Sequence, residues 1–345
     1  MIRASVQALA PYVPGEQPKL KRVVKLNANE NAYPPSPKVK EALAAFDPAA
    51  LRLYPDPGAN RLRHLLARRY GCKAESVFVG NGSDEVLRLA IDVFVRNAAP
   101  VGVFSPSYSL YPVLAAIREA PLCTLPLPED DAALAALEIP DPRPDLFCLV
   151  NPNAPTGTMF GAEAVRAFAR SLAPSVLLID ETYALFAGED CMRLALEEPN
   201  VVVSRSFSKA WSLAGLRVGV LVGPAPLVGA VMKEKDSYNV DAVALAVAEA
   251  ALSDPEWTAR NVSRIVETRE AFSAGLRAKG WTVVPSRTNF VWCRPPEPKT
   301  AEEVQARVRR WGFLVRRFAD DPATAGWLRV SMGTREEMEE LLGLV

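Results

Sequence analysis

Short apolar runs alternate with helix-like stretches through the middle of the chain. Several of the runs lack the alternation of polar and apolar residues that a half-exposed strand has. They lie at residues 76–80, 100–105, 145–150, 175–180, 200–206 and 217–223. Because a strand that is apolar on both sides is typical of a sheet buried on both faces, this pattern predicts an α/β domain with a mostly parallel central sheet.

Beyond about residue 240 the pattern changes to long helices, followed by strand-like and helix-like stretches in alternation. We therefore expect three parts. Residues 1–30 form an N-terminal arm that joins the smaller domain, residues 31–240 form the large domain, and residues 241–345 form a small α+β domain. In an open α/β sheet, ligands bind beyond the carboxyl ends of the strands, so candidate chemistry is expected there.

Composition excludes several classes of function. The 345 residues include 40 Lys and Arg and 40 Asp and Glu, and this balance favours neither a nucleic-acid nor a membrane partner. We find no signal peptide and no apolar run long enough to span a membrane. The single histidine, His64, excludes a multi-histidine metal site, and we expect no metal. Five cysteines without C-x-x-C spacing indicate free thiols and a cytoplasmic protein.

Two residues beside predicted strands are candidates for chemistry. Lys209, in SFSKAWSLAGLR (206–217), follows a buried strand, where desolvation lowers the pKa of an amine and makes it a nucleophile toward a carbonyl. Taken alone, Lys209 is better explained as a surface lysine. Asp180 ends the run 175–180 and is either a helix cap or the partner of a cationic ring nitrogen.

Three strand-to-helix turns provide weaker signals. In GNGSDE, Gly82 allows a tight turn, and Ser83 and Asp84 begin a helix whose free N–H groups and dipole suit a phosphate. Tyr108, in the next turn, can lie over a flat heterocycle. The turn at 151–157, NPNAPTG, is strongly fixed by its Asn and Pro residues. Each turn also has a purely structural explanation.

Arginines near the C-terminus are candidates for binding an anion. Arg329 lies within an apolar run, and Arg316 lies close to it in sequence. An arginine in apolar surroundings favours a buried guanidinium that is paired with a carboxylate or phosphate, whereas solvent exposure is the common alternative.

Together these motifs resemble the histidinol-phosphate aminotransferase family of fold-type I enzymes, which depend on pyridoxal phosphate. The motifs occur in the family's order: LNANEN, LYPDP, GNGSDE, SPSYSLY, NPNAPTG, IDETY, SFSKAWSLAGLR, TNF and LRVSMGTREE. They extend from about residue 26 to the C-terminus. The element around Lys209 is the most specific, and the shared order is stronger evidence than any single motif.

The resemblance implies that Lys209 holds pyridoxal phosphate as a Schiff base and later moves a proton. It implies that Asp180 pairs with the ring nitrogen, that Tyr183 hydrogen-bonds the phenolic oxygen of the ring, and that Tyr108 stacks on it. The further cofactor contacts that it implies are Gly82, Ser83, Asp84, Asn153, Ser206, Ser208 and Arg217, with Tyr54 reaching the neighbouring subunit of a homodimer. The substrate contacts that it implies are Tyr12, Asn29, Arg316 and Arg329.

One position departs from the family pattern. The family turn is Asn-Asn-Pro-Thr-Gly, and here Ala154 stands where the second Asn donates to the phenolic oxygen. Losing one hydrogen bond to a charged oxygen costs roughly 1.5–3 kcal/mol. Either Tyr183 carries the contact alone or Asn153 shifts to replace it.

The resemblance implies an enzyme that transfers the amino group between histidinol phosphate and 2-oxoglutarate or glutamate by a ping-pong mechanism in histidine biosynthesis. The same anion-binding arginines suit an aromatic amino-acid aminotransferase or a threonine-phosphate decarboxylase, so these alternatives stay open. A non-catalytic sensor on the same fold is a weaker alternative, because the balanced charge provides no basic face for nucleic acid.

Overall fold

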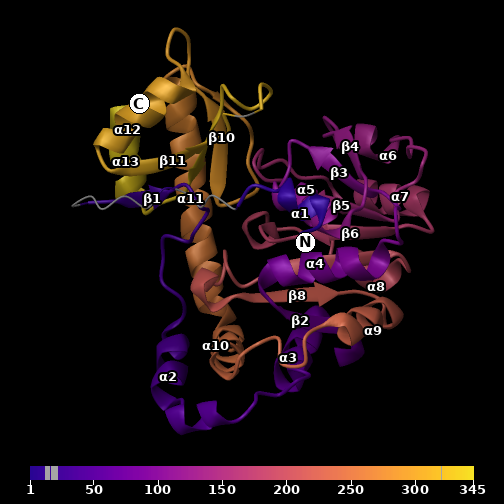
Figure 1. Ribbon diagram of the computed structural model, residues 1–345. Coiled ribbons are helices and arrows are strands. Elements are labelled where there is room, and N and C mark those ends of the chain that lie inside the picture. Colours follow the sequence, from indigo (N-terminus) through magenta and orange to yellow (C-terminus); the bar gives the residue numbers. More distant parts are fainter. Residues whose placement is uncertain (12–15, 17–21, 320) are drawn as a thin grey trace.

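Two sheets organise the protein (Figure 1). The computed structural model describes residues 1–11, 16, 22–319 and 321–345. The larger sheet has the strand order β2-β8-β7-β6-β5-β3-β4. Its strands are β2 (Val77–Asn81), β3 (Val101–Ser105), β4 (Leu122–Pro126), β5 (Leu146–Val150), β6 (Val176–Asp180), β7 (Val201–Ser206) and β8 (Val218–Val222).

Strand direction in the larger sheet brings distant segments to one edge. Strands β4, β3, β5, β6 and β7 are mutually parallel, and β8 runs antiparallel to both β7 and β2. The predicted mostly parallel sheet is therefore confirmed. Because β8 runs the opposite way, its first residue lies at the edge where the parallel strands end. Residues just before β8 consequently meet those that follow β6 and β7.

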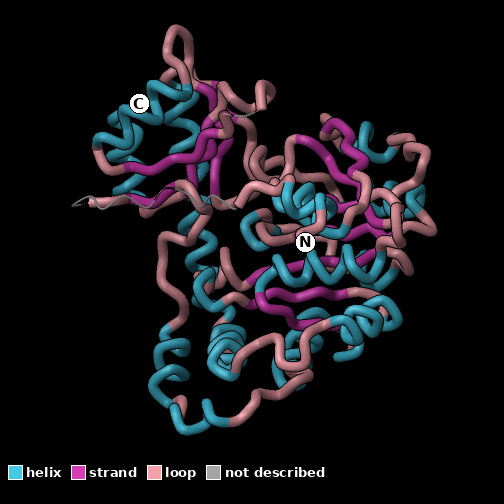
Figure 2. Tube along the Cα trace, viewed as in Figure 1, coloured by secondary structure: helices cyan, strands magenta, loops and turns pink. Residues whose placement is uncertain are grey.

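The larger sheet is covered on both faces, as Figure 2 shows. Helices α3 (Asn60–Tyr70), α7 (Ala162–Leu172) and α10 (Ala242–Leu252) pack on one face, and α4 (Gly82–Phe94), α5 (Leu110–Arg118) and α9 (Ala225–Glu234) pack on the other. Successive strand residues point to opposite faces, so Leu177 and Ile179 enter one apolar cluster and Leu178 enters the other. Burial of both faces explains why the apolar runs do not alternate.

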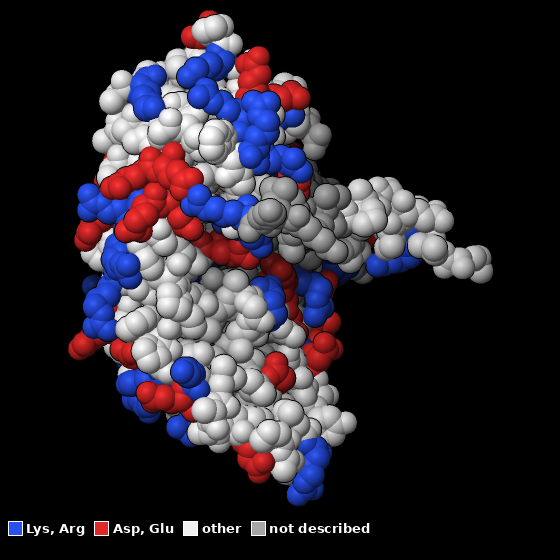
Figure 3. Space-filling view, turned by 90° about the vertical axis from the view of Figure 1, so that its left-hand side faces the viewer, with Lys and Arg blue, Asp and Glu red and all other residues white. Residues whose placement is uncertain are grey.

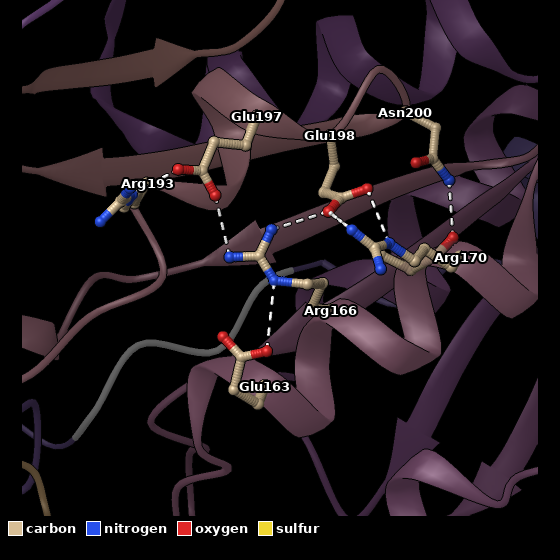
Figure 4. Close-up of polar contacts among 8 residues, drawn as sticks. Glu163, Arg166, Arg170, Arg193, Glu197, Glu198 and Asn200 are labelled. Carbon is tan, nitrogen blue, oxygen red and sulfur yellow. Dashed lines mark hydrogen bonds and ion pairs between the residues drawn. The ribbon is translucent and has the colours of Figure 1, made fainter.

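An ion-pair network fixes α7 against α8 (Leu194–Glu197) and the start of β7 (Figure 4). Arg166 pairs with Glu197 at 2.9 Å and with Glu198 at 2.7 Å, and Arg170 pairs with Glu198 at 2.8 Å. Beside them, the amide of Asn200 donates to two backbone carbonyls, those of residues 169 and 175. These contacts hold the helix that covers β5 and β6 in register with the strand that leads to Lys209.

The smaller sheet has the order β1-β11-β12-β10-β9, with β1 parallel to β11 and the other pairs antiparallel. Its strands are β1 (Val24–Leu26), β9 (Thr282–Val283), β10 (Phe290–Arg294), β11 (Phe313–Arg317) and β12 (Leu328–Ser331). Helices α11 (Pro255–Ala278), α12 (Ala301–Arg310) and α13 (Arg335–Leu344) pack on it. The remaining helices are α1 (Ala4–Gln7), α2 (Pro37–Ala45), α6 (Asp131–Ala135), Pro48–Arg52, Ala74–Ser76, Ala184–Phe186 and Ala214–Leu216.

The packing differs from the predicted boundary at residue 241. Helix α10 follows that boundary, yet its buried residues belong to the core of the larger sheet, and it packs on α2 and α3. An almost uniformly apolar helix, AVALAVAEAAL, has no polar face that would indicate which core it enters. The long helix α11, which follows α10, connects the two bodies (Figure 1).

The surface charges and the cysteines do not indicate a particular function. Acidic and basic side chains both occur on the face drawn in Figure 3. All five cysteines are free thiols. Within the described residues, no helix combines the length and the apolar character that crossing a membrane requires.

Candidate active site

The candidate residues gather where the parallel strands of the larger sheet end. Asp180 is the last residue of β6, Ser206 is the last residue of β7, and Arg217 directly precedes β8. The helix α4, which begins at Gly82, follows β2 at the same edge because β2 is antiparallel to β8. Strand direction thus brings together residues that are far apart in the sequence.

Lys209 lies half-buried just beyond β7. Its amine donates to the backbone carbonyl of Ala28 at 3.1 Å, and the side chain of Asn31 donates to the backbone carbonyl of Lys209 at 3.0 Å. Desolvation, assisted by the positive charge of Arg329, lowers the pKa of Lys209 to about 8. Roughly a tenth of the amine is therefore unprotonated at pH 7 and able to attack a carbonyl carbon.

Asp180 is a buried carboxylate with hydroxyl and amide partners. Its Oδ1 accepts from the amide and the hydroxyl of Thr182, at 3.0 and 2.7 Å, and its Oδ2 accepts from Tyr111 at 3.1 Å. No Lys or Arg in the described part of the chain forms an ion pair with it. Burial raises the pKa of Asp180, against the opposing hydrogen bonds from Thr182. A cationic ligand group, such as a protonated ring nitrogen, suits this environment.

Two glycines allow an anion cradle to form around the start of α4. Gly82 has φ +81°, and a Cβ there would lie 2.5 Å from Nη2 of Arg217. A Cβ on Gly219 would lie 2.6 Å from the backbone nitrogen of Ser83. The N-terminus of α4 can approach β8 this closely only because neither position has a side chain.

Cationic and N–H donors line this cradle. Arg217 forms an ion pair with Asp84 at 3.2 Å. Ser206 pairs with Gly219 across β7 and β8, and its hydroxyl accepts from the amide of Ser208 at 3.1 Å. An arginine, two serines and a helix N-terminus are the donor set that a phosphate requires. The predicted Gly82, Ser83, Asp84, Ser206, Ser208 and Arg217 thus lie together.

The two predicted aromatic residues, Tyr108 and Tyr183, differ in exposure and in partners. Tyr108 is half-exposed, its hydroxyl lies 3.4 Å from Oδ1 of Asp84, and its ring meets Tyr111 edge-on. Tyr183 is buried, and its phenolic oxygen accepts from Nδ2 of Asn29 at 2.8 Å. Burial raises the pKa of Tyr183, so this side chain stays a neutral hydroxyl.

Asn153 holds the turn in which it lies. Its amide donates to the carbonyl of Pro106 at 3.0 Å and to the hydroxyl of Thr156 at 2.8 Å, and it accepts from Ser107 at 3.0 Å. These three bonds use both ends of the amide. A shift of Asn153 to replace the side chain missing at Ala154 would have to break them.

Arg316 and Arg329 stand opposite each other on β11 and β12. Both guanidinium groups lie over the ring of Phe318, at 5.7 and 5.4 Å, and Arg329 donates to the carbonyl of Asn27 at 3.0 Å. The next residue, Arg317, pairs instead with Glu302 of α12 at 3.4 Å. Alternation along the strand therefore separates Arg316, which neighbours Arg329, from Arg317.

Other predicted positions have different environments. Asn29 is buried with both ends of its amide engaged by Tyr183 and Ser331. Tyr54 is 80% exposed and stacks on Tyr238 at 4.3 Å, and within the described residues no contact joins it to the crevice. Tyr12 lies outside the described residues.

Sequence reasoning did not assign roles to four residues that contact the site. Thr182 and Tyr111 bind Asp180, and the segment containing Ala28 and Asn31 contacts Lys209. Tyr111 lies only three residues after Tyr108, in the same strand-to-helix turn, and this closeness is a signal that could have indicated its role. The contacts of the segment around Ala28 have no local pattern, because they join residues about 180 positions apart.

A nucleophilic lysine, a buried carboxylate and an anion cradle at the carboxyl edge of a covered sheet define an enzyme that works through a bound anionic carbonyl compound. The cradle, the unpaired carboxylate and the lysine all fit pyridoxal phosphate, the cofactor that the resemblance implies. The chain belongs to the aminotransferase class I and II family, whose model matches residues 21–345.

Relatives and solved structures agree with this assignment. The chain is 42% identical over 342 residues to histidinol-phosphate aminotransferase of Geotalea uraniireducens (strain Rf4), which covers 99% of this chain and 97% of that relative. It is 40% identical over 341 residues to the enzyme so named from Gluconacetobacter diazotrophicus, covering 97% and 94%. The structure of histidinol-phosphate aminotransferase from Sinorhizobium meliloti in complex with pyridoxal-5'-phosphate has a TM-score of 0.88, at 28% identity and 99% and 95% coverage. The predicted family and the fold-type I fold are confirmed.

Proposed function

We propose that this protein transfers the amino group between histidinol phosphate and 2-oxoglutarate or glutamate, with pyridoxal phosphate as cofactor. One observation carries the proposal. The positive charge of Arg329 helps to lower the pKa of Lys209. Arg329 in turn stands opposite Arg316 on the neighbouring strand. A nucleophile and an anion site are thus adjacent, in a chain 42% identical over nearly its full length to a relative named for this reaction.

The residues of the crevice have separate tasks toward the cofactor. Bound pyridoxal phosphate supplies a ring that takes up the electron pair released when a substrate carbon loses its proton. Asp180 accepts a hydrogen bond from the ring N–H and keeps that nitrogen protonated. Arg217, with the N–H groups at the start of α4, binds the phosphate. Tyr183 donates its hydroxyl proton to the phenolic oxygen of the ring.

Lys209 does the covalent and proton-transfer work. Its amine attaches the cofactor covalently while no substrate is bound. With a substrate bound, the free amine of Lys209 would accept the proton from the substrate's α-carbon and pass it to C4′ of the cofactor. A pKa of about 8 suits an amine that has to accept and release a proton in one cycle near neutral pH.

Arg316 and Arg329 provide one anion site for both halves of the ping-pong cycle. In the first half the phosphate of histidinol phosphate occupies it, and in the second the carboxylate of 2-oxoglutarate or glutamate does so. Planar guanidinium groups bind either anion through paired N–H donors. Arg329 is anchored on the carbonyl of Asn27, so the site stays in place as anions exchange.

We further propose that two copies of the chain form a homodimer in the cytoplasm, with Tyr54 of one copy reaching the cofactor phosphate of the other. The support is that Leu51, Leu53 and Tyr54 are all more than half exposed, which is unfavourable for a free surface. The five free thiols support a reducing compartment.

The test is a half-reaction followed by absorbance. Histidinol phosphate added to cofactor-loaded protein converts the cofactor from its aldehyde form to its amine form, and 2-oxoglutarate reverses the change with release of glutamate. Threonine phosphate and aromatic amino acids are run in parallel, with carbon dioxide measured for the former. Loaded protein that shows no turnover with histidinol phosphate contradicts the proposal, and carbon dioxide release would assign a decarboxylase instead.

A further inference from the structure

Asn29 lies at the centre of a buried hydrogen-bond network that joins the two bodies of the protein. Its backbone N–H donates to Oγ of Ser331 at 2.9 Å, and that hydroxyl donates to Oδ1 of Asn29 at 2.9 Å. Asn289 donates to the carbonyl of Asn29 at 3.0 Å. The other end of the amide, Nδ2, donates to the phenolic oxygen of Tyr183 at 2.8 Å. Only 2% of the surface of Asn29 is exposed, so water does not compete.

The network decides the direction of each hydrogen bond. Because the Ser331 oxygen accepts from the backbone of Asn29, its single proton is available for Oδ1. With Oδ1 serving as the acceptor, the NH₂ group faces Tyr183, and an NH₂ group can only donate. The oxygen of Tyr183 therefore accepts from Asn29, and its own proton is directed away from Asn29. The phenol keeps that proton, because burial raises its pKa.

The neighbouring turn makes this direction important. Ala154 is buried in the same apolar cluster as Tyr183 and has no side-chain donor. Asn153, the adjacent residue, uses its amide to hold the turn. With no donor at Ala154 and the amide of Asn153 engaged, the hydroxyl proton of Tyr183 is available to the phenolic oxygen of a bound ring.

We propose that Asn29 is a positioning residue that holds the hydroxyl of Tyr183 as a hydrogen-bond donor toward the phenolic oxygen of bound pyridoxal phosphate. The inference rests on the proposed function, because it concerns the cofactor of that function. Ser331 belongs to β12 of the smaller sheet, whereas Tyr183 follows β6 of the larger sheet. The donor is consequently oriented only when the two bodies are seated against each other.

The experiment measures the pH midpoint of the absorbance titration of cofactor-loaded protein without substrates. Tyr183→Phe removes the donor, so the phenolic oxygen holds its shared proton more tightly and the midpoint rises by about 1–2 pH units. Asn29→Ala frees the hydroxyl of Tyr183 to rotate, and we expect a smaller rise. Asn29→Asp places a carboxylate that accepts the Tyr183 proton, and we expect a rise at least as large as that of Tyr183→Phe.

A double-mutant cycle separates positioning from structural support. If Asn29 acts through Tyr183, Asn29→Ala leaves the midpoint unchanged in the Tyr183→Phe background. Any shift that Asn29→Asp still causes in that background is the effect of its charge alone and is subtracted. A merely structural role lowers the unfolding temperature but does not shift the midpoint of the correctly loaded variant.

The outcomes of the two proposals are distinguishable. Loaded Asn29→Ala and Asn29→Asp proteins that keep the unmodified midpoint overturn the role of Asn29 and leave the proposed function intact. An equal Asn29→Ala shift in both backgrounds overturns it too. Failure of the unmodified chain to bind pyridoxal phosphate overturns the proposed function, and this inference with it.

Discussion

The hydroxyl of Tyr111 lies 3.1 Å from Oδ2 of Asp180, and both side chains are buried. This bond holds the carboxylate that is assigned to the ring nitrogen. Tyr111→Phe removes the bond with little change of shape. We expect cofactor affinity to fall about 5- to 10-fold, the effect of roughly 1 kcal/mol. Equilibrium dialysis of pyridoxal phosphate, with thermal unfolding to verify folding, measures it. An unchanged dissociation constant would show that Thr182 alone orients Asp180.

The cradle around α4 depends on the absence of a side chain at Gly82. Gly82→Ala places a Cβ about where Arg217 lies, so we expect cofactor affinity to fall at least about 10-fold. Gly188→Ala is a matched control, because Gly188 has a similar φ of +79° and no neighbour within 4 Å of the added Cβ. Both variants have the strain of a left-handed residue, about 1 kcal/mol. Equal cofactor affinity in the two variants would contradict the cradle.

Arg316 and Arg317 of β11 are consecutive, but only Arg316 lies beside Arg329 in the proposed anion site. Arg316→Gln removes one guanidinium from the anion site, and we expect KM for histidinol phosphate to rise about 10- to 100-fold, the effect of losing roughly 1.5–3 kcal/mol. Arg317→Gln removes a similar charge from the opposite side of the strand, where it pairs with Glu302. Its KM should stay within about 2-fold of the unmodified value. Steady-state kinetics decides, and equal effects would place the anion elsewhere.

The reactivity of Lys209 should depend on pH in a specific way. Burial and the charge of Arg329 lower its pKa from 10.5 to about 8, so the free amine, and with it the rate of cofactor attachment, increases as pH rises through 8. Arg329→Gln removes a positive charge that disfavours the ammonium form of Lys209. The pH midpoint of cofactor attachment should therefore move upward toward 10.5. Stopped-flow loading of cofactor-free protein compares the variant with Arg317→Gln. A midpoint unmoved in Arg329→Gln would exclude this electrostatic contribution.

Much of the fold could be predicted because the larger sheet is buried on both faces. Runs such as 145–150 and 175–180 are apolar throughout for that reason, and a strand ending in a carboxylate indicated Asp180. Helix α10, just beyond the predicted boundary at 241, packs with the larger sheet, and its almost uniformly apolar sequence has no polar face that would select a core. Strand alternation, once β11 is paired with β12, distinguishes Arg316 from Arg317.

The remaining contacts could not be predicted from local patterns. The bonds from Lys209 to Ala28 and from Asn29 to Tyr183 join segments more than 150 residues apart, and only the paired sheets bring them together. The contacts of Asn153, with Thr156 in its own turn and with Pro106 of the preceding turn, likewise could not be predicted, because a sequence does not specify which way an amide points. The sequence motifs indicated which residues lie at the site, whereas tertiary packing determined which partners each of them contacts.

The account depends most directly on where the cofactor is attached. Cofactor-loaded protein is reduced with borohydride, digested, and the peptide bearing the pyridoxyl group is sequenced by mass spectrometry. We predict a single modified peptide spanning SFSKAW, with the group on Lys209. A modification on any other lysine, or none in protein that binds pyridoxal phosphate, would contradict the account.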